Sequence, residues 1–327
     1  MKALKKIMLN RALALAVLNV FMFLLFSLFF GERYFSLTNI GIILLNMSAE
    51  AFVLVAMSIL LFLGQIDLSL GSSMVMAAMI CGRFMLFYHI PMGWVILIVV
   101  CVGFVTGVIN GLIVSFLKIA PFIVTLATSM IIMGIAVMLA GSGWSDFQNE
   151  LFHAMGSAKV FGFIQLPVIY AVVLFTIFAY LTTKNRFFRN VYFIGGNEKA
   201  AELSGLNIKL TKILVFAFAA VLAALAGVVS AMRFNTAMTS IGTGVELRAV
   251  TAAVIGGVAF TGGKGTIPGA AMGALLIASL NNVLMMFKLS PDLQFAVTGI
   301  VLVLTILLDS LISGSLRKTP APRRDKI

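Results

Sequence analysis

Apolar residues fill long segments of this chain that contain no charge. Residues 12–31, 84–117, 119–145, 160–183 and 265–287 have no Asp, Glu, Lys or Arg. The hydrocarbon core of a bilayer is about 30 Å thick and needs roughly 20 apolar residues in a helix, so each segment is long enough to cross it. Strand-like alternation is absent, and lipid offers the backbone no hydrogen-bond partners, so helices are expected.

With the shorter apolar stretches included, the pattern predicts ten membrane spans. They cover about 12–30, 40–63, 68–88, 92–117, 121–141, 163–182, 212–232, 248–262, 266–287 and 293–313. No soluble domain interrupts them, so residues 1–327 are expected to form a single transmembrane domain. The first span follows a basic segment but has no small-residue cleavage site after it, which favours a retained helix over a signal peptide.

Composition supports the same fold class, an all-α polytopic membrane protein. Hydrophobic residues make up 61% of the 327 residues and charged residues only 10%, whereas about a quarter of a soluble domain is charged. The net charge of +12 does not indicate nucleic-acid binding, because the charges lie in short loops and tails. Lipid is therefore the expected environment, and the bacterial inner membrane the expected location.

The distribution of basic residues predicts the orientation of the chain. If both termini are cytoplasmic and ten spans alternate, six of the 23 Lys and Arg fall outside, which leaves 17 inside. Cytoplasmic loops carry such an excess of Lys and Arg. The six external residues would be Arg33, Arg83, Lys159, Arg233, Arg248 and Lys288.

Two short similarities suggest an internal repeat. The segment 66–69 opens the third span as 245–248 opens the eighth, and 110–121 resembles 281–291 in its Asn, Lys and Pro positions. Five spans separate the copies, so pseudo-repeats over about 12–162 and 163–313 would have inverted topology, which is typical of transporters. Between the spans lie a cytoplasmic loop at 183–212 and, at the end, a basic cytoplasmic tail at 314–327.

Polar residues within or beside the apolar spans are candidates for a solute pathway. Each has a structural alternative: Asp67 or Ser69 could cap the third span by bonding the amides of residues 70 and 71, and the others could join helices by hydrogen bonds. We expected Asp67 at the cytoplasmic boundary and Glu246 at the external one, paired with Arg248 or Arg233. The pathway candidates are Glu50, Asp67, Ser69, Asn110, Thr125, Thr128, Glu246, Asn281 and Asn282.

The loop between the sixth and seventh spans predicts a short cytoplasmic helix bounded by glycines. Asn197 is a good N-cap, Glu198 suits the positive end of the helix dipole, and Gly205 is a plausible stop. Such a helix could be a simple connector or a lever that docks into another protein. The residues proposed for this role are Gly196, Asn197, Glu198, Ala200, Ala201, Glu202, Ser204 and Gly205.

Other motifs argue against an enzyme. A phosphate-binding loop has a glycine, any four residues and then Gly-Lys-Ser/Thr. The segment Gly262-Gly263-Lys264-Gly265-Thr266 does not fit, because a glycine follows its lysine. Cys81 and Cys101 lie in apolar segments, and His89 and His153 have no metal-ligand spacing. No catalytic residue, no metal site and no cofactor bound by this chain are therefore expected, and any ATP must be used by a partner.

Four stretches of the sequence resemble stretches that occur in the same order in the permeases of ribose-type sugar ABC importers. They are the 195–205 helix, Gly64-Gln65-Ile66-Asp67-Leu68-Ser69-Leu70-Gly71-Ser72, Pro121-Phe122-Ile123-Val124-Thr125-Leu126, and 246–257 followed by 262–265. The resemblance extends over about 40–310. Gln65 and Ala127 replace glycines common in the family, which leaves the substrate open.

The resemblance implies a set of partners and a mechanism. The partners would be an ABC ATPase subunit that binds ATP and Mg, a periplasmic solute-binding protein and a second permease, identical or paralogous. The helix at 197–204 would couple ATP hydrolysis to alternating access. Three alternatives stay open: an ion-coupled secondary transporter, an ABC permease for branched-chain amino acids, and, less well supported, a membrane enzyme.

Overall fold

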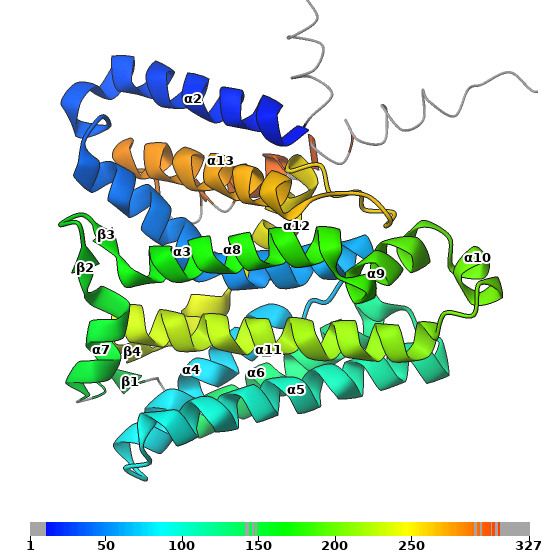
Figure 1. Cartoon of the computed structure of the whole chain (residues 1–327). Helices are drawn as coiled ribbons and strands as arrows, with labels where there is room; N and C mark the ends of the chain where they lie inside the picture. The colour runs from blue at the N-terminus through cyan, green and yellow to red at the C-terminus, as the bar shows by residue number, and fades with distance from the viewer. Residues whose placement is uncertain are drawn as a thin grey trace, which may run out of the picture.

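The computed structural model describes residues 11–140, 144–145, 147, 149–290, 293–294, 296–301, 303–304 and 307. The predicted tail at 314–327 and about half of the predicted tenth span lie outside these residues. Most of the described chain is helical (Figure 1). The elements are α2(Arg11–Phe30), η1(Gly31–Arg33), α3(Leu37–Phe62), α4(Leu70–Leu86), α5(Met92–Leu117), α6(Pro121–Ala140), β1(Trp144–Ser145), α7(Glu150–Ser157), β2(Lys159–Val160), β3(Ile164–Gln165), α8(Leu166–Lys184), α9(Arg186–Gly196), α10(Glu198–Leu203), α11(Ile208–Phe234), β4(Thr236–Ala237), η2(Thr239–Gly242), α12(Val245–Ile255) and α13(Ile267–Met286).

Seven of the described helices are long and apolar enough to cross a membrane. These are α2, α3, α5, α6, α8, α11 and α13. Helices α4 and α12 have 17 and 11 residues, which corresponds to about 25 Å and 16 Å at 1.5 Å per residue. The prediction of predominantly helical, membrane-spanning structure is confirmed, whereas the third and eighth predicted spans are shorter helices than we expected.

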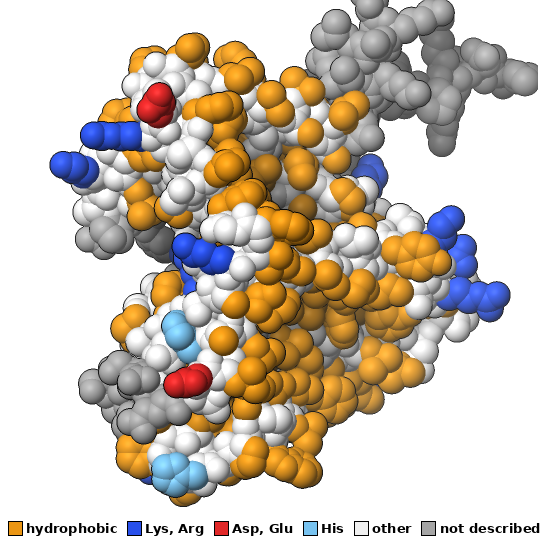
Figure 2. Space-filling model, turned by 60° about the vertical axis from the view of Figure 1, so that its left-hand side comes forward, with side chains coloured by type: hydrophobic (Ala, Val, Ile, Leu, Met, Phe, Trp, Pro, Cys, Tyr) orange, Lys and Arg blue, Asp and Glu red, His pale blue; other side chains and the backbone are white. Residues whose placement is uncertain are grey.

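Helix α3 lies at the centre of the bundle. Its residues Ala51–Phe62 are all buried, and it packs against α8, α11, α12 and α13. Helix α11 packs in turn against α5 and α4. The outside of the bundle is apolar as well: hydrophobic side chains cover much of the face drawn in Figure 2, as expected for a protein solvated by lipid.

Small residues bring two helix pairs into close contact. A Cβ at Gly103 would lie 2.9 Å from the Ala224 Cβ, and one at Gly107 would overlap the backbone of α11. Gly269 and Gly273 approach the backbone of α12 in the same way. Two glycines spaced four residues apart thus pack α5 on α11, and two more pack α13 on α12, as small residues commonly do where membrane helices approach closely.

The two ends of the bundle differ. At one end, β1 pairs antiparallel with β4, and β2 with β3, beside α7. At the other end lie α9 and α10 (Figure 1). The end with α9 and α10 holds the loop that we predicted to be cytoplasmic.

Candidate functional site

A cavity of about 830 Å³ opens between α3, α11, α12 and α13. Its walls are partly apolar, with Met47, Leu54 and Ile277 among them, and partly polar. The polar and charged lining residues are Asn46, Glu50, Ser230, Arg233, Ser240, Thr243, Arg248, Asn281, Gln294 and Thr298. A mixed wall of this kind suits a small solute that has both hydroxyl groups and apolar faces.

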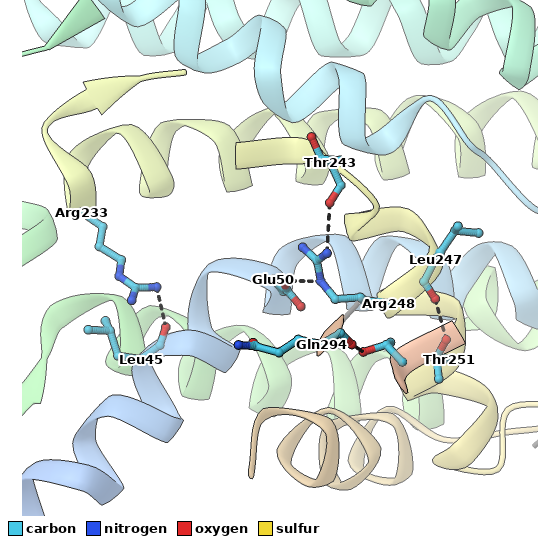
Figure 3. A network of polar contacts seen from close by, with 9 residues as sticks. Leu45, Glu50, Arg233, Thr243, Leu247, Arg248, Thr251 and Gln294 are labelled. Carbon is cyan, nitrogen blue, oxygen red and sulfur yellow. Dashed lines mark hydrogen bonds and ion pairs between the residues drawn. The ribbon is translucent and has the colours of Figure 1, made fainter. Parts of the chain in front are cut away.

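Three charged side chains meet in this cavity (Figure 3). Arg248 Nε donates to Glu50 Oε1 at 2.8 Å and its Nη1 donates to the Thr243 carbonyl at 3.0 Å. Arg233 donates to the Leu45 carbonyl at 3.2 Å and to Asn46 Oδ1 at 2.8 Å. Of the two arginines suggested as partners of Glu246, Arg248 forms its ion pair with Glu50 instead and acts on Glu246 only electrostatically, whereas Arg233 bonds neutral oxygens.

Five of the predicted pathway residues form a separate hydrogen-bonded network where α4, α5 and α6 meet. Asp67 Oδ1 accepts from the Ser69 amide and hydroxyl at 2.7 and 2.5 Å. Ser69 Oγ accepts from Asn110 Nδ2 at 3.1 Å, and Thr128 Oγ1 donates to Asn110 Oδ1 at 2.7 Å. Thr125 Oγ1 accepts from the Leu68 amide at 3.0 Å.

This network differs from the helix cap that we expected. Ser69 is the N-cap of α4 but its side chain bonds no amide of the first turn, and Asp67 bonds the residue 69 amide rather than those of residues 70 and 71. Asp67, Ser69, Asn110 and Thr125 are at most 1% exposed, and none of the five lines the cavity. Their contacts therefore hold the start of α4 against its neighbours.

Glu246 lies beside the start of α4 as well. Its carboxylate occupies the space next to Gly71, where a Cβ would overlap it. The expectation that Asp67 and Glu246 stand at opposite membrane boundaries is therefore wrong, because α4 and α12 begin next to each other. Two short helices that start inside the protein bring these carboxylates together.

The two asparagines of α13 have different surroundings. Asn281 lines the cavity, and its Oδ1 is buried without a partner in the described part of the chain. Asn282 is buried and donates to Asn39 Oδ1 of α3 at 2.9 Å. Asn281 thus belongs to the cavity wall, whereas Asn282 joins two helices.

The predicted helix at 197–204 is present as α10. Asn197 Oδ1 accepts from the Ala200 amide at 3.0 Å, Glu198 begins the helix, and Gly205 takes a positive φ of 78° after its end. Glu198 Oε1 pairs with Lys212 Nζ of α11 at 2.8 Å. Among the other predicted coupling residues Ala201 is buried, whereas Glu202 and Ser204 are exposed.

Close backbone contacts connect this region to the cavity helices. The Gly263 amide donates to the Phe62 carbonyl of α3 at 2.9 Å, and a Cβ at Gly195 would overlap that carbonyl. Tyr192 stacks on Phe62 with ring centroids 4.4 Å apart and donates to the Gly265 carbonyl at 3.1 Å. Burial raises the pKa of the Tyr192 phenol, so the phenol keeps its proton for this bond. We call these contacts among the end of α3, the end of α9 and the 262–265 loop the glycine joint.

Sequence reasoning missed several residues of these sites. Arg233 and Arg248 were placed in external loops, and the amphipathic helix α9 was not predicted. Asn185 caps α9 by accepting from the Phe187 amide at 2.8 Å. The apolar residues Phe188, Val191 and Ile194 of α9 are buried. This spacing of three residues was a readable helical signal.

Comparison with known proteins identifies the family. The family model described as "Branched-chain amino acid transport system / permease component" matches residues 42–306. The ribose import permease protein of Haemophilus influenzae is 34% identical over 85% of this chain and 86% of its own length. No solved structure matches the chain significantly.

Two relatives from Escherichia coli K12 cover similar lengths. The D-allose transport system permease protein is 34% identical over 86% of this chain and 86% of its own length. The galactose/methyl galactoside import permease protein is 32% identical over 87% of this chain and 90% of its own length. The chain therefore belongs to this family of transport-system permease components and is a multi-pass protein of the bacterial inner membrane.

Proposed function

We propose that this chain imports a sugar as the membrane subunit of an ABC transporter. The observation that carries the proposal is the similarity, over about 85% of the chain, to permeases named for ribose, D-allose and galactose. The cavity is consistent with such a solute, because its lining includes the neutral polar residues Asn46, Ser240 and Asn281. Sugar hydroxyls can both donate to and accept from such groups.

Import would proceed by alternating access powered by a partner ATPase, which binds ATP and Mg while this chain binds neither. Coupling would use Gly196–Gly205, because α10 projects at one end of the bundle (Figure 1). The glycine joint supports this assignment, since it links the end of α9 to α3, which carries Glu50, and to the loop between α12 and α13. A tilt of α10 would thus reach three walls of the cavity.

The remaining partners follow from the same proposal. A periplasmic solute-binding protein would deliver the sugar, a second permease would complete the membrane part, and lipid would cover the rest, with no role for nucleic acid. Ten spans with both termini in the cytoplasm would place α9 and α10 on the ATPase side. The matching φ values of 56° at Lys118 and 57° at Lys288 support the proposed inverted repeat.

Gentle affinity purification from native membranes tests the proposal. We expect a stoichiometric ATPase to co-purify, with Mg-ATP hydrolysis and ATP-dependent sugar uptake in proteoliposomes. A lone chain that takes up solute under an ion gradient would identify a secondary transporter. ATP-dependent uptake of leucine but of no sugar would favour the branched-chain amino acid alternative.

A further inference from the structure

The cavity walls carry an excess positive charge. Their charged residues within the described structure are Glu50, Arg233 and Arg248, so the formal sum is +1. Glu50 and Arg248 form an ion pair at 2.8 Å, with side chains 34% and 20% exposed. Arg233 is left with neutral acceptors, a carbonyl and an amide oxygen. Glu50 acts on Arg233 electrostatically but is hydrogen-bonded to Arg248, so no carboxylate of the described residues forms an ion pair with Arg233 itself.

An arginine in this setting favours an anionic ligand. A guanidinium that is partly withdrawn from water is destabilised unless it is paired. Its five N–H donors form a planar fork that matches the two oxygens of a carboxylate, and the described contacts of Arg233 occupy only two of its nitrogens. Arg233 also lies 4.7 Å from the centroid of the Phe234 ring, which restrains its orientation before a ligand arrives.

Neighbouring groups suit the remainder of a sugar. Ser230 precedes Arg233 by three residues on α11, so both point from the same face of the helix. Ser230 lines the cavity but is only 1% exposed, and its Oγ is buried without a hydrogen-bond partner in the described chain. Asn281 Oδ1 offers an acceptor from α13. A sugar whose carboxylate binds Arg233 would thus lie beside polar residues of α11 and α13 that line the cavity.

We propose that the transported sugar carries a carboxylate, as a hexuronate or an aldonate does, and that Arg233 is the residue that recognises it. This inference rests on the proposed function and narrows its substrate class. A carboxylate matches the single excess positive charge, whereas a phosphate monoester carries about −1.5 to −2 at neutral pH. Arg233 then acts as a specificity-determining residue and the Glu50–Arg248 pair as part of the neutral wall.

Direct binding to the full-length permease in lipid nanodiscs tests the inference. The probes are D-galacturonate and D-galactose, which differ only in the oxidation of one carbon, and L-leucine, all at equal ionic strength. We expect D-galacturonate to bind at least about tenfold more tightly than D-galactose, the ratio typical of one charge-assisted interaction. In Arg233→Gln this ratio should fall toward one, and Arg233→Lys should give an intermediate ratio because it keeps the charge but not the fork.

Arg83→Gln is the matched control. Arg83 lies near the end of α4 with its guanidinium 4.8 Å from the Phe87 ring centroid, outside the cavity, so its loss should leave the ratio unchanged. Equal or tighter binding of D-galactose by the wild-type chain would overturn the carboxylate inference and leave sugar import standing. Binding of leucine alone would overturn both, and binding of no probe would overturn the inference. The wild-type ratio decides these outcomes even if a variant fails to fold.

Discussion

Adding one methyl group at Gly195 should separate the coupling region from the cavity helices. In the glycine joint, a Cβ at this position would overlap the Phe62 carbonyl and lie 3.0 Å from the Gly263 nitrogen. The same carbonyl accepts the Gly263 amide at 2.9 Å. Gly195→Ala must therefore move α9 away from α3 or break this hydrogen bond, because both neighbours are backbone atoms.

The adjacent glycine provides a matched control. The nearest atom to a Cβ at Gly196 is the Gly263 Cα at 3.9 Å, which is an ordinary contact. Overpacking typically costs about 1–3 kcal/mol, and a lost hydrogen bond costs about 1 kcal/mol. The higher helix propensity of alanine offsets up to about 1 kcal/mol of this. The free energy of unfolding should thus fall by about 1–3 kcal/mol in Gly195→Ala and stay level or rise slightly in Gly196→Ala.

Two assays separate stability from coupling. Equilibrium unfolding of the purified variants in mixed micelles gives the free-energy difference. Solute uptake per ATP hydrolysed, measured on the assembled transporter, should fall in Gly195→Ala and fall less in Gly196→Ala, which adds no close contact with the 262–265 loop. If the two variants have the same stability and the same uptake per ATP, the glycine joint is not a close contact and does not transmit motion.

Three further predictions concern the other polar groups. Asp67→Ala should lower the free energy of unfolding by about 1–3 kcal/mol, because the buried Ser69 amide loses its acceptor; an unchanged value in chemical unfolding would contradict the network. Glu50→Gln should reduce the uptake rate more than the amount of protein in the membrane, because it removes the negative member of the cavity's ion pair; normal uptake would remove Glu50 from the pathway. Glu198→Arg should uncouple uptake from ATP hydrolysis, with under about 1 kcal/mol of stability lost because the Glu198 side chain is 53% exposed. Adding Lys212→Glu should restore part of the coupling, and normal uptake in the single variant would contradict the assignment.

The long helices were predictable because one physical constraint acts on each of them separately. A segment of 20 or more apolar residues needs lipid around it and internal hydrogen bonds, whatever its neighbours are. The cap of α10 was predictable for a similar reason, since Asn197 and the amide it accepts are three residues apart. Features that depend on residues distant in the sequence were not. Glu50 and Arg248 are 198 residues apart, and no local pattern indicates that they meet.

Arg233 and Arg248 show a second limit of sequence reasoning. Basic residues near the ends of apolar spans are usually assigned to loops, because their charges orient the protein in the membrane. Here both side chains instead line a cavity within the bundle. Counting charges cannot tell an arginine in a loop from one in a cavity. An arginine can lie within the membrane where it faces a water-filled cavity and pairs with another group.

The start of α4 explains why the predicted pathway residues divide into two groups. The first backbone amides of a helix have no partner within the helix. Where the helix begins inside the protein, water cannot bond these amides and side chains must do so. Thr125 bonds the Leu68 amide and Asp67 bonds the Ser69 amide, so these polar side chains are needed by the backbone itself. Such groups have the same composition as a solute site, which is why the sequence did not separate them. The contacts distinguish them: the Asp67 network is directed at backbone and neighbouring side chains, whereas Ser230, Asn281 and Arg233 line the cavity, and the described contacts leave part of the Arg233 guanidinium without an acceptor.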